Sequence, residues 1–454
     1  MGPAGQGGMT SPPSDRGGAD GTRRPAPPAD QHTYLAFLAS GLALALCGGF
    51  VLSLLLPLAP LLHWHVNREA LAQAHGWTQL DGWLGLVAAG MALRLLPRFA
   101  HRAPLPSKPT VVLLCLLVAG GVLRLTGQLA SGPASVLLVP GAALEAAGLA
   151  GVSAALLWTL ARSRGRRESW RSAAWAAAAW WAIWAALALL GGVRAAGNGG
   201  LIPPELDEAS VWAVLLGAIG NLVWAVQARS VPVFYGRDVP RRLEVPLIAS
   251  NLGVAMVLAA AAGGGTALRA AGFGVAGAGI LWLAPLAGSV HGRPHRLRPP
   301  SRPSGRFIVT ANRWAMVAGA CLCVGAALAA WRGTPMLEHF EDAALHALGL
   351  GLATTLIVGM ARLVAPVFAI ARAEPGAEPK ALYLTWLALL VATTLRVAAA
   401  LLPEALPVTW SDALLALAGS MAWVGLALFA ASLGQAWARQ AARRDALVRS
   451  ARQR

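Results

Sequence analysis

The apolar residues of this chain of 454 residues fall in long blocks that are separated by short polar segments. Each block is about 20 residues or longer, which is the length that an α-helix needs to cross the hydrocarbon core of a bilayer. Apolar and polar residues do not alternate in steps of two, as they would in a transmembrane β-barrel. The pattern therefore predicts an all-α polytopic membrane protein with about twelve transmembrane helices.

The predicted spans follow one another with short connections, and their ends are placed to within a few residues. They are 34–58, 73–97, 109–130, 134–161, 171–193, 208–233, 243–265, 267–290, 308–331, 342–370, 380–402 and 410–437. The glycine run at 263–265 separates the seventh span from the eighth and is the least distinct boundary. Residues 1–32 are rich in Pro, Gly and Ser and are predicted to be disordered, and the first span is predicted to act as an uncleaved signal anchor.

An arginine that is followed by a proline after three or four residues ends the second, sixth and tenth spans. The motifs run from Arg94 to Pro97, from Arg229 to Pro232 and from Arg362 to Pro366. Because this signal recurs at every fourth helix, the simplest organisation is three units of four helices. The predicted parts are a disordered N-terminus at 1–32, membrane unit one at 33–167, unit two at 168–300, unit three at 301–440 and a basic tail at 441–454.

The composition changes the list of expected partners. Hydrophobic residues make up 56% of the chain and charged residues only 13%, whereas a soluble domain carries roughly 25% charged residues. The net charge of +17 would by itself suggest binding to nucleic acid. However, the basic residues lie in short loops between apolar blocks, where they face lipid head groups. We therefore expect the lipid bilayer as a partner and no nucleic acid.

The distribution of basic residues also predicts the orientation in the membrane. Most Lys and Arg residues fall in the N-terminus, in the loops after even-numbered spans and in the C-terminal tail. The loops after odd-numbered spans, together with the first turn of the span that follows, carry only Arg68, Arg194, Arg269 and Arg332. Since short basic loops stay on the cytoplasmic side, both termini are predicted to be cytoplasmic.

Histidine and arginine recur inside the predicted spans of units one and three. Arg124 follows His75 by 49 residues, and Arg396 follows His346 by 50 residues. The predicted topology places all four side chains in the outer leaflet. Unit two has no histidine on its second span, and Arg269 stands at a different offset.

These four residues have two interpretations. The arginines either extend to outer head groups or bind a fixed anion inside the bundle, because an arginine within a span costs at least about 2.5–3.5 kcal/mol. The histidines are either buried and hydrogen-bonded to neighbours or bind a haem iron from both sides. In the second case Arg124 and Arg396 are suited to pair with the haem propionates.

Other polar residues are further candidates. Asp81 on the second span and Glu145 on the fourth are intramembrane carboxyl groups, which are either functional or protonated and inert. The loop residues His63 and His65, together with His339, are candidates for a copper site because imidazole suits copper.

The chain resembles the NnrS family of bacterial membrane proteins. The resemblance rests on two segments, His75-Gly76-Trp77-Thr78-Gln79-Leu80-Asp81-Gly82-Trp83 running into Arg94-Leu95-Leu96-Pro97, and His346-Ala347-Leu348 running through Gly359-Met360 to Arg362. The family is similar to the haem–copper oxidase subunit I fold, in which histidines on helices two and ten hold a low-spin haem. The resemblance implies a haem protein of the bacterial inner membrane, with copper as a second candidate cofactor, that acts in the response to nitric oxide or nitrosative stress.

The chain departs from the family at several positions. Family members commonly carry a His-x-His pair at the start of helix two, whereas Trp77 stands at the second position here, and Asp81 replaces an apolar residue. Spans six and seven carry no histidine. An enzyme with the binuclear centre of the oxidases is therefore disfavoured, because function depends on the site and not on the fold.

Two further function classes stay open at this point. The first is a transporter of a small anion that uses Arg124 and Arg396 for binding and Asp81 as a proton-coupled switch, since internal repeats are common in transporters. The second is a membrane scaffold without a cofactor. The sequence favours a haem-binding membrane protein over both and leaves open whether it is an enzyme.

Overall fold

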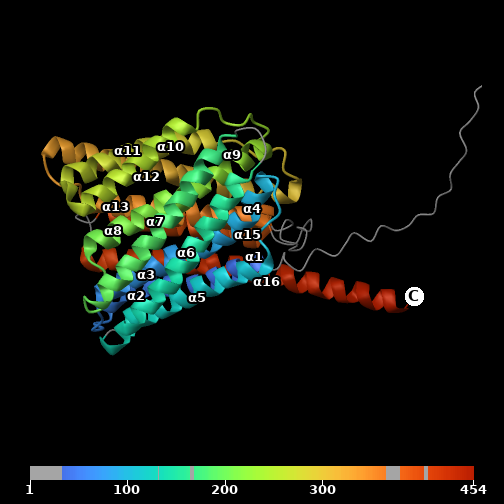
Figure 1. Cartoon of the computed structure of the whole chain (residues 1–454), viewed down its shortest axis with the longest axis horizontal. Helices are drawn as coiled ribbons and strands as arrows, with labels where there is room; N and C mark the ends of the chain where they lie inside the picture. The colour runs from blue at the N-terminus through green and yellow to red at the C-terminus, as the bar shows by residue number, and fades with distance from the viewer. Residues whose placement is uncertain (1–32, 131, 164–167, 365–378, 403–406, 454) are drawn as a thin grey trace, which may run out of the picture.

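The computed structural model describes residues 33–130, 132–163, 168–364, 379–402 and 407–453. In these residues the chain forms a bundle of long helices and contains no strand (Figure 1). The all-α prediction is therefore confirmed. The N-terminal segment predicted to be disordered lies outside the described residues, as does Pro366 of the third Arg–Pro motif.

In each of the three predicted units, the second span is divided into an α-helix, a π-helix and a further α-helix. Unit one contains α1 (Thr33–Leu44), η2 (Ala45–Gly49), α2 (Phe50–Leu61), α3 (Arg68–Trp77), η3 (Thr78–Gly85), α4 (Leu86–Phe99), α5 (Ser107–Ala130), η4 (Gly132–Leu137) and α6 (Leu138–Ala161). Unit two contains α7 (Trp170–Ala196), α8 (Pro204–Trp212), η5 (Ala213–Gly220), α9 (Asn221–Tyr235), α10 (Glu244–Ala259), η6 (Ala260–Gly264) and α11 (Gly265–Ala287). Unit three contains α12 (Ser304–Arg332), α13 (Glu338–His346), η8 (Ala347–Thr354), α14 (Thr355–Val364), α15 (Pro379–Leu401) and α16 (Val408–Gln453), after the short turn η7 (Pro299–Ser301).

Eleven helices in the described part of the chain are long and apolar enough to cross a membrane. One of them, Glu244–Ala287, has 44 residues and would be about 66 Å long if straight, about twice the thickness of a hydrocarbon core. It folds back at Gly263 and Gly265, whose φ angles of 112° and 81° are open only to glycine at little cost. A Cβ at Gly279 on α11 would lie 2.6 Å from the Ser250 nitrogen on α10, so the two halves pack as antiparallel spans. Among the described residues the bundle thus has twelve segments that are long and apolar enough to cross a membrane.

The second span of each unit occupies the centre of the bundle. Between 72% and 89% of its most apolar stretch is buried, against 33% to 50% for the other spans. Each second span contains an eight-residue π-helix, η3, η5 or η8, and the three π-helices contact one another. Since π-helices in α-helical proteins are frequent at functional sites, the three π-helices mark the centre of the bundle as the candidate region for a functional site.

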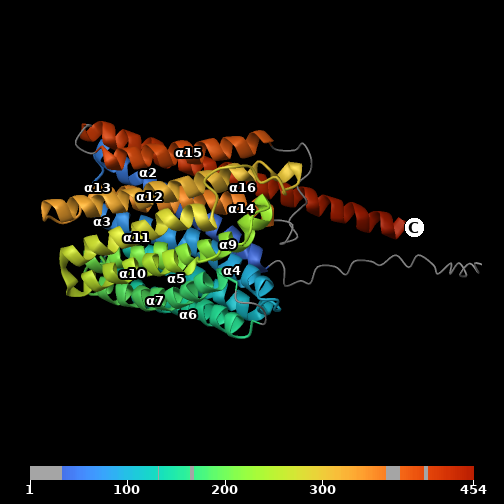
Figure 2. The ribbon, with the colours of Figure 1, turned by 90° about the horizontal axis from the view of Figure 1, so that it is seen from above.

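The last span closes the bundle against the first. Trp423 on α16 donates from Nε1 to the Leu46 carbonyl over 3.0 Å, and a Cβ at Gly419 would lie 3.1 Å from the Ser53 hydroxyl. Figure 2 shows α15 and α16 on one side of the bundle and α6 and α7 on the other. The C-terminal part of α16 extends beyond the end of the bundle (Figures 1 and 2).

Candidate functional site

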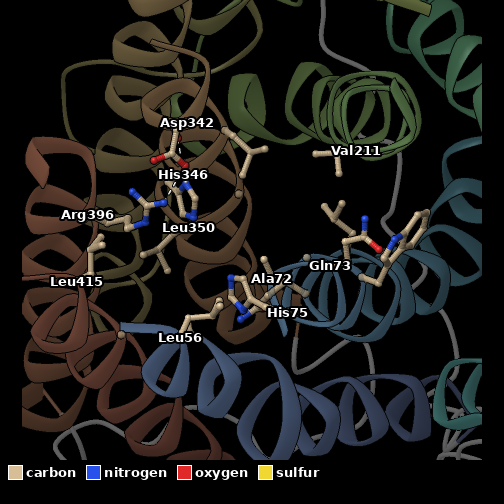
Figure 3. Close-up of a pocket in the computed structure, with 18 of the residues that line it drawn as sticks. Leu56, Ala72, Gln73, His75, Val211, Asp342, His346, Leu350, Arg396 and Leu415 are labelled. Carbon is tan, nitrogen blue, oxygen red and sulfur yellow. Dashed lines mark hydrogen bonds and ion pairs between the residues drawn. The ribbon is translucent and has the colours of Figure 1, made fainter. Parts of the chain in front are cut away.

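A cavity of about 700 Å³ lies where the three second spans meet α2, α15 and α16. This volume is within the range of about 300–1,000 Å³ that is usual for small-molecule and cofactor sites. Its walls are mostly apolar, and the polar side chains that reach it include His75, His346, Arg396 and Asp342. Figure 3 shows His346, Asp342 and Arg396 together on one wall and His75 on another.

His75 reaches the cavity from α3. This helix begins after Asn67, whose side chain accepts a hydrogen bond from the Ala70 nitrogen and caps the first turn. The His75 Nδ1 lies 2.8 Å from the carbonyl oxygen of Gly49 on η2. Because a carbonyl oxygen can only accept, Nδ1 carries the proton and Nε2 keeps its lone pair.

His346 is the last residue of α13 and has the same tautomer. Its Nδ1 lies 2.9 Å from the Asp342 carbonyl oxygen and 3.0 Å from the Asp342 carboxylate. The same carboxylate oxygen accepts a hydrogen bond from Arg396 Nη2 over 2.7 Å. Asp342 therefore fixes both side chains on this wall. Sequence analysis did not select Asp342, although its position one helical turn before His346 places the two on one face.

The two imidazoles thus have the features of metal-binding histidines. Such residues usually donate their second ring N–H to a carboxylate or a backbone carbonyl, which fixes the tautomer and the ring orientation. His75 and His346 do so from two different central helices that line one cavity. The structure therefore brings His75 and His346 to one cavity, and their binding of a haem iron stays a prediction.

Arg124 does not line this cavity. Its Nη1 donates to Glu145 over 2.7 Å, and Asp81 lies 3.7 Å away. The guanidinium lies 3.7 Å above the ring of Trp77, a cation–π geometry, and the side chain is only 3% exposed. Arg124 is thus bound to the protein's own carboxylates, so the structure does not bring it to the same site as Arg396.

Arg124, Asp81 and Glu145 border a small cavity of their own, and Trp77 lies between it and the large cavity. The Trp77 side chain lines both cavities. On the cavity side, its Nε1 donates to Asp207 over 3.0 Å. Sequence analysis missed Asp207 because the sixth span was predicted to begin at 208, whereas α8 begins at Pro204. The longer helix brings Asp207 and Glu208 to the cavity wall.

Arg269 is the residue of unit two that was compared with Arg124 and Arg396, and it joins units two and three near the same cavity. Its Nε donates to Glu208 over 2.7 Å, and its Nη2 donates to Glu341 over 2.7 Å. Glu208 lies on α8 of unit two and Glu341 on α13 of unit three. Arg269, whose position in its unit differs from those of Arg124 and Arg396, thus also pairs with carboxylates in a different way, because its two partners belong to two units.

The candidates for a copper site do not gather into one. His63 and His65 are exposed between α2 and α3, and His339 lies on α13 with its ring 4.5 Å from that of Phe340. No group of three or more His, Cys, Asp or Glu side chains that could hold a metal ion occurs in the described ranges. A copper site therefore has no support from the placement of these residues.

No protein-family model matches the chain, and no curated protein sequence matches it. The resemblance to the NnrS family thus remains a prediction from sequence motifs. The proposal for the function depends on the geometry of the cavity.

Proposed function

We propose that this multi-pass membrane protein binds a haem in the large cavity, where His75 and His346 would hold its iron. The observation that carries the proposal is the pair of imidazoles on one cavity, each with Nδ1 hydrogen-bonded and Nε2 available. Histidine is a common axial ligand of haem iron. A role in the response to nitric oxide, in a bacterial inner membrane with both termini cytoplasmic, follows from the sequence resemblance and the basic loops and is part of the proposal.

The residues of the cavity fit a haem in three respects. The volume of about 700 Å³ is suitable for a large cofactor, and apolar side chains such as Leu56 and Leu350 offer surfaces for a porphyrin (Figure 3). Arg396 lies on the wall and uses Nη2 for Asp342. Because a guanidinium has five N–H donors, Arg396 retains donors for a propionate.

The protein's own groups would orient and tune such a cofactor. The Gly49 carbonyl and Asp342 hold the two rings, and the negative charge of Asp342 increases the electron donation by His346. A haem in this environment would supply one-electron chemistry. Spans six and seven carry no histidine, so the proposal does not include a binuclear centre.

Visible spectroscopy tests this proposal directly. The full chain is expressed with an adequate supply of haem, purified in detergent and examined for a haem Soret band. We expect a band in the wild type, a changed or lost band in His75→Ala and in His346→Ala, and no change in His291→Ala, because His291 is exposed and away from the cavity wall. A colourless wild type would overturn the proposal.

Transport of a small anion is the second candidate, but its predicted binding pair is divided between two places. Arg124 is paired with Glu145 and Arg396 with Asp342, and only Arg396 lines the large cavity. If the purified protein is colourless, anion uptake into proteoliposomes that is lost in Arg396→Gln would favour this alternative.

A further inference from the structure

A buried group of three charged side chains lies beside the large cavity and has no part in the proposed haem site. Asp81 comes from η3, Arg124 from α5 and Glu145 from α6. Their side chains are 9%, 3% and 2% exposed, and Arg124 Nη1 lies 3.7 Å from Asp81 and 2.7 Å from Glu145. Two carboxyl groups therefore share one guanidinium inside a membrane bundle.

The elements around this group supply no second positive charge among the described residues. A Cβ atom added at Gly191 on α7 would lie 3.7 Å from Arg124 Nη2, so this side of the guanidinium faces a glycine. The uncharged Trp184, also on α7, packs against Gly85, which is one turn after Asp81. Leu44 from α1 and Trp77 from α3 complete the wall. The carboxyl group of Asp207 lies on the large-cavity side of Trp77, where it accepts the hydrogen bond from the indole Nε1. With all three groups ionised, the cluster would carry one uncompensated negative charge.

Three buried polar atoms of the cluster make no hydrogen bond within the described part of the chain. Both carboxyl oxygens of Asp81 and the Nη2 of Arg124 are buried without a hydrogen-bond partner among the described residues. They border a small cavity of about 20 Å³ that is also lined by Thr78, Gln128 and Glu145. A cavity of that size has room for one water molecule, which requires about 10–15 Å³.

We propose that Asp81 and Glu145 together hold one exchangeable proton and form a proton-binding site within the membrane. The proton converts one carboxylate into a carboxylic acid, so the cluster becomes neutral with one carboxylate paired to Arg124. This removes the energetic penalty of an unpaired charge in a medium of low dielectric constant. The proton arrives from a hydronium ion and leaves to water, and no other reactant is needed.

One hydrogen bond joins the wall of this site to the wall of the large cavity. Gln128, on the wall of the small cavity, donates to Gln73 over 2.9 Å, and Gln73 lines the large cavity and also donates to the Ile202 carbonyl over 2.8 Å. Trp77 contacts both compartments. Gln73 and Trp77 thus belong to the boundary between the site and the large cavity, through which the proton would exchange.

Infrared spectroscopy of the purified full chain counts the protonated carboxyl groups through their carbonyl stretching band. We compare the wild type with Asp81→Asn, Glu145→Gln and the double variant at neutral pH, in water and in heavy water. Asp412→Asn is the matched control, because Asp412 is a buried carboxyl group of another wall. The proposal predicts that each single variant loses the intensity of one carboxylic acid, with a shift in heavy water for the wild-type band.

The double variant gives the decisive comparison. If the two residues share one proton, the double variant loses no more intensity than either single variant. No loss in any variant would mean that both groups are ionised, and a doubled loss would mean that both are protonated; either result overturns the proposal. If the variants do not fold, Glu341→Gln keeps the idea testable. Glu341 is another buried carboxyl group, and a carboxylic acid band must remain at neutral pH after its removal; a band that is lost entirely in Glu341→Gln overturns the proposal.

The same measurement distinguishes a proton from a metal cation. We record the wild-type spectrum in sodium chloride and in choline chloride at equal ionic strength. An unchanged band supports a proton site, whereas a band that disappears in sodium identifies a sodium site and overturns the proposal. A colourless protein that retains the shared-proton band would leave this inference intact while removing the proposed haem.

Discussion

Trp83 donates a hydrogen bond from Nε1 to the Thr354 hydroxyl over 3.0 Å, and this bond joins the π-helices η3 and η8. The two side chains are 0% and 2% exposed. The Thr354 hydroxyl in turn donates to the Gly349 carbonyl over 2.9 Å, and Thr354 lines the large cavity. Units one and three are thus held together beside the proposed haem site.

Thr354→Val should destabilise the protein, although the two side chains have nearly the same shape. The change leaves the Trp83 N–H buried without an acceptor, which costs about 1–3 kcal/mol. Thr393→Val is the matched control, because the buried Thr393 hydroxyl bonds only the Leu389 carbonyl of its own helix among the described residues. The midpoint of thermal unfolding in detergent measures both, and equal midpoints would contradict the importance of the Trp83 bond.

The contact between α5 and α6 gives a second stability prediction. A Cβ at Gly120 would lie 2.6 Å from the Glu145 nitrogen, whereas a Cβ at Gly121 would meet nothing within 4 Å. Gly120→Ala must push α6 away, weaken the Arg124–Glu145 ion pair and cost about 1–3 kcal/mol. Gly121→Ala should be neutral or stabilising by up to about 1 kcal/mol. Thermal unfolding of the two variants would refute the close packing if their order were reversed.

The helices could be predicted from the sequence because a membrane span needs only length and hydrophobicity. The chain reversal at Gly263 was the least distinct boundary, and the structure shows why. The apolar character continues through the turn, and only the positive φ angles of the glycines mark it. The glycine residues therefore indicate the turn, whereas the hydropathy of the segment does not change there.

The correspondence between the repeats was harder to predict. Trp77, Trp212 and His346 each stand directly before the π-helix of their unit. His346 therefore matches Trp77, and His75 lies two positions earlier, although the spacing to the arginines suggested that the two histidines correspond. A π-helix changes the residue count per turn, so hydrophobic periodicity does not predict which way the side chains around it point.

The partners of the polar residues were the least predictable feature. Arg124 and Arg396 have similar spacing from a histidine, yet Arg124 faces Glu145 and Arg396 faces Asp342. Pairing across helices depends on rotation and depth of each helix, and a single sequence specifies neither closely.

A topology experiment tests the division of residues Glu244–Ala287 into two spans. A reporter that is active only outside the cytoplasm is fused after Gly264 and, separately, after Gly292. We expect activity only for the first fusion, because the loop after α11 is rich in basic residues and basic loops stay inside. Equal activity of both fusions would mean that these 44 residues cross the membrane once.

Arg396 and Arg124 should differ in their effect on haem. Arg396→Gln removes a charged donor from the cavity wall and should lower haem affinity roughly 10- to 100-fold, the equivalent of about 1.5–3 kcal/mol. Arg124→Gln should lower the thermal midpoint and leave the affinity of the folded protein unchanged, because Arg124 is outside the cavity. Haem titration of both variants decides the matter, and an equal loss of affinity would restore the pairing of both arginines with propionates.

Asp342→Asn should alter the haem without removing it. The Asp342 backbone carbonyl, 2.9 Å from His346 Nδ1, is unaffected and keeps the ring in place. Loss of the negative charge makes the imidazole a weaker electron donor, which destabilises ferric haem and shifts the midpoint potential to a more positive value. The shift is about 59 mV for each tenfold change in the relative affinity for the two oxidation states. Redox titration of the Soret band measures it, with Asp412→Asn as the control on the same cavity; an unchanged or more negative potential in Asp342→Asn would show that this carboxylate does not act on an axial ligand.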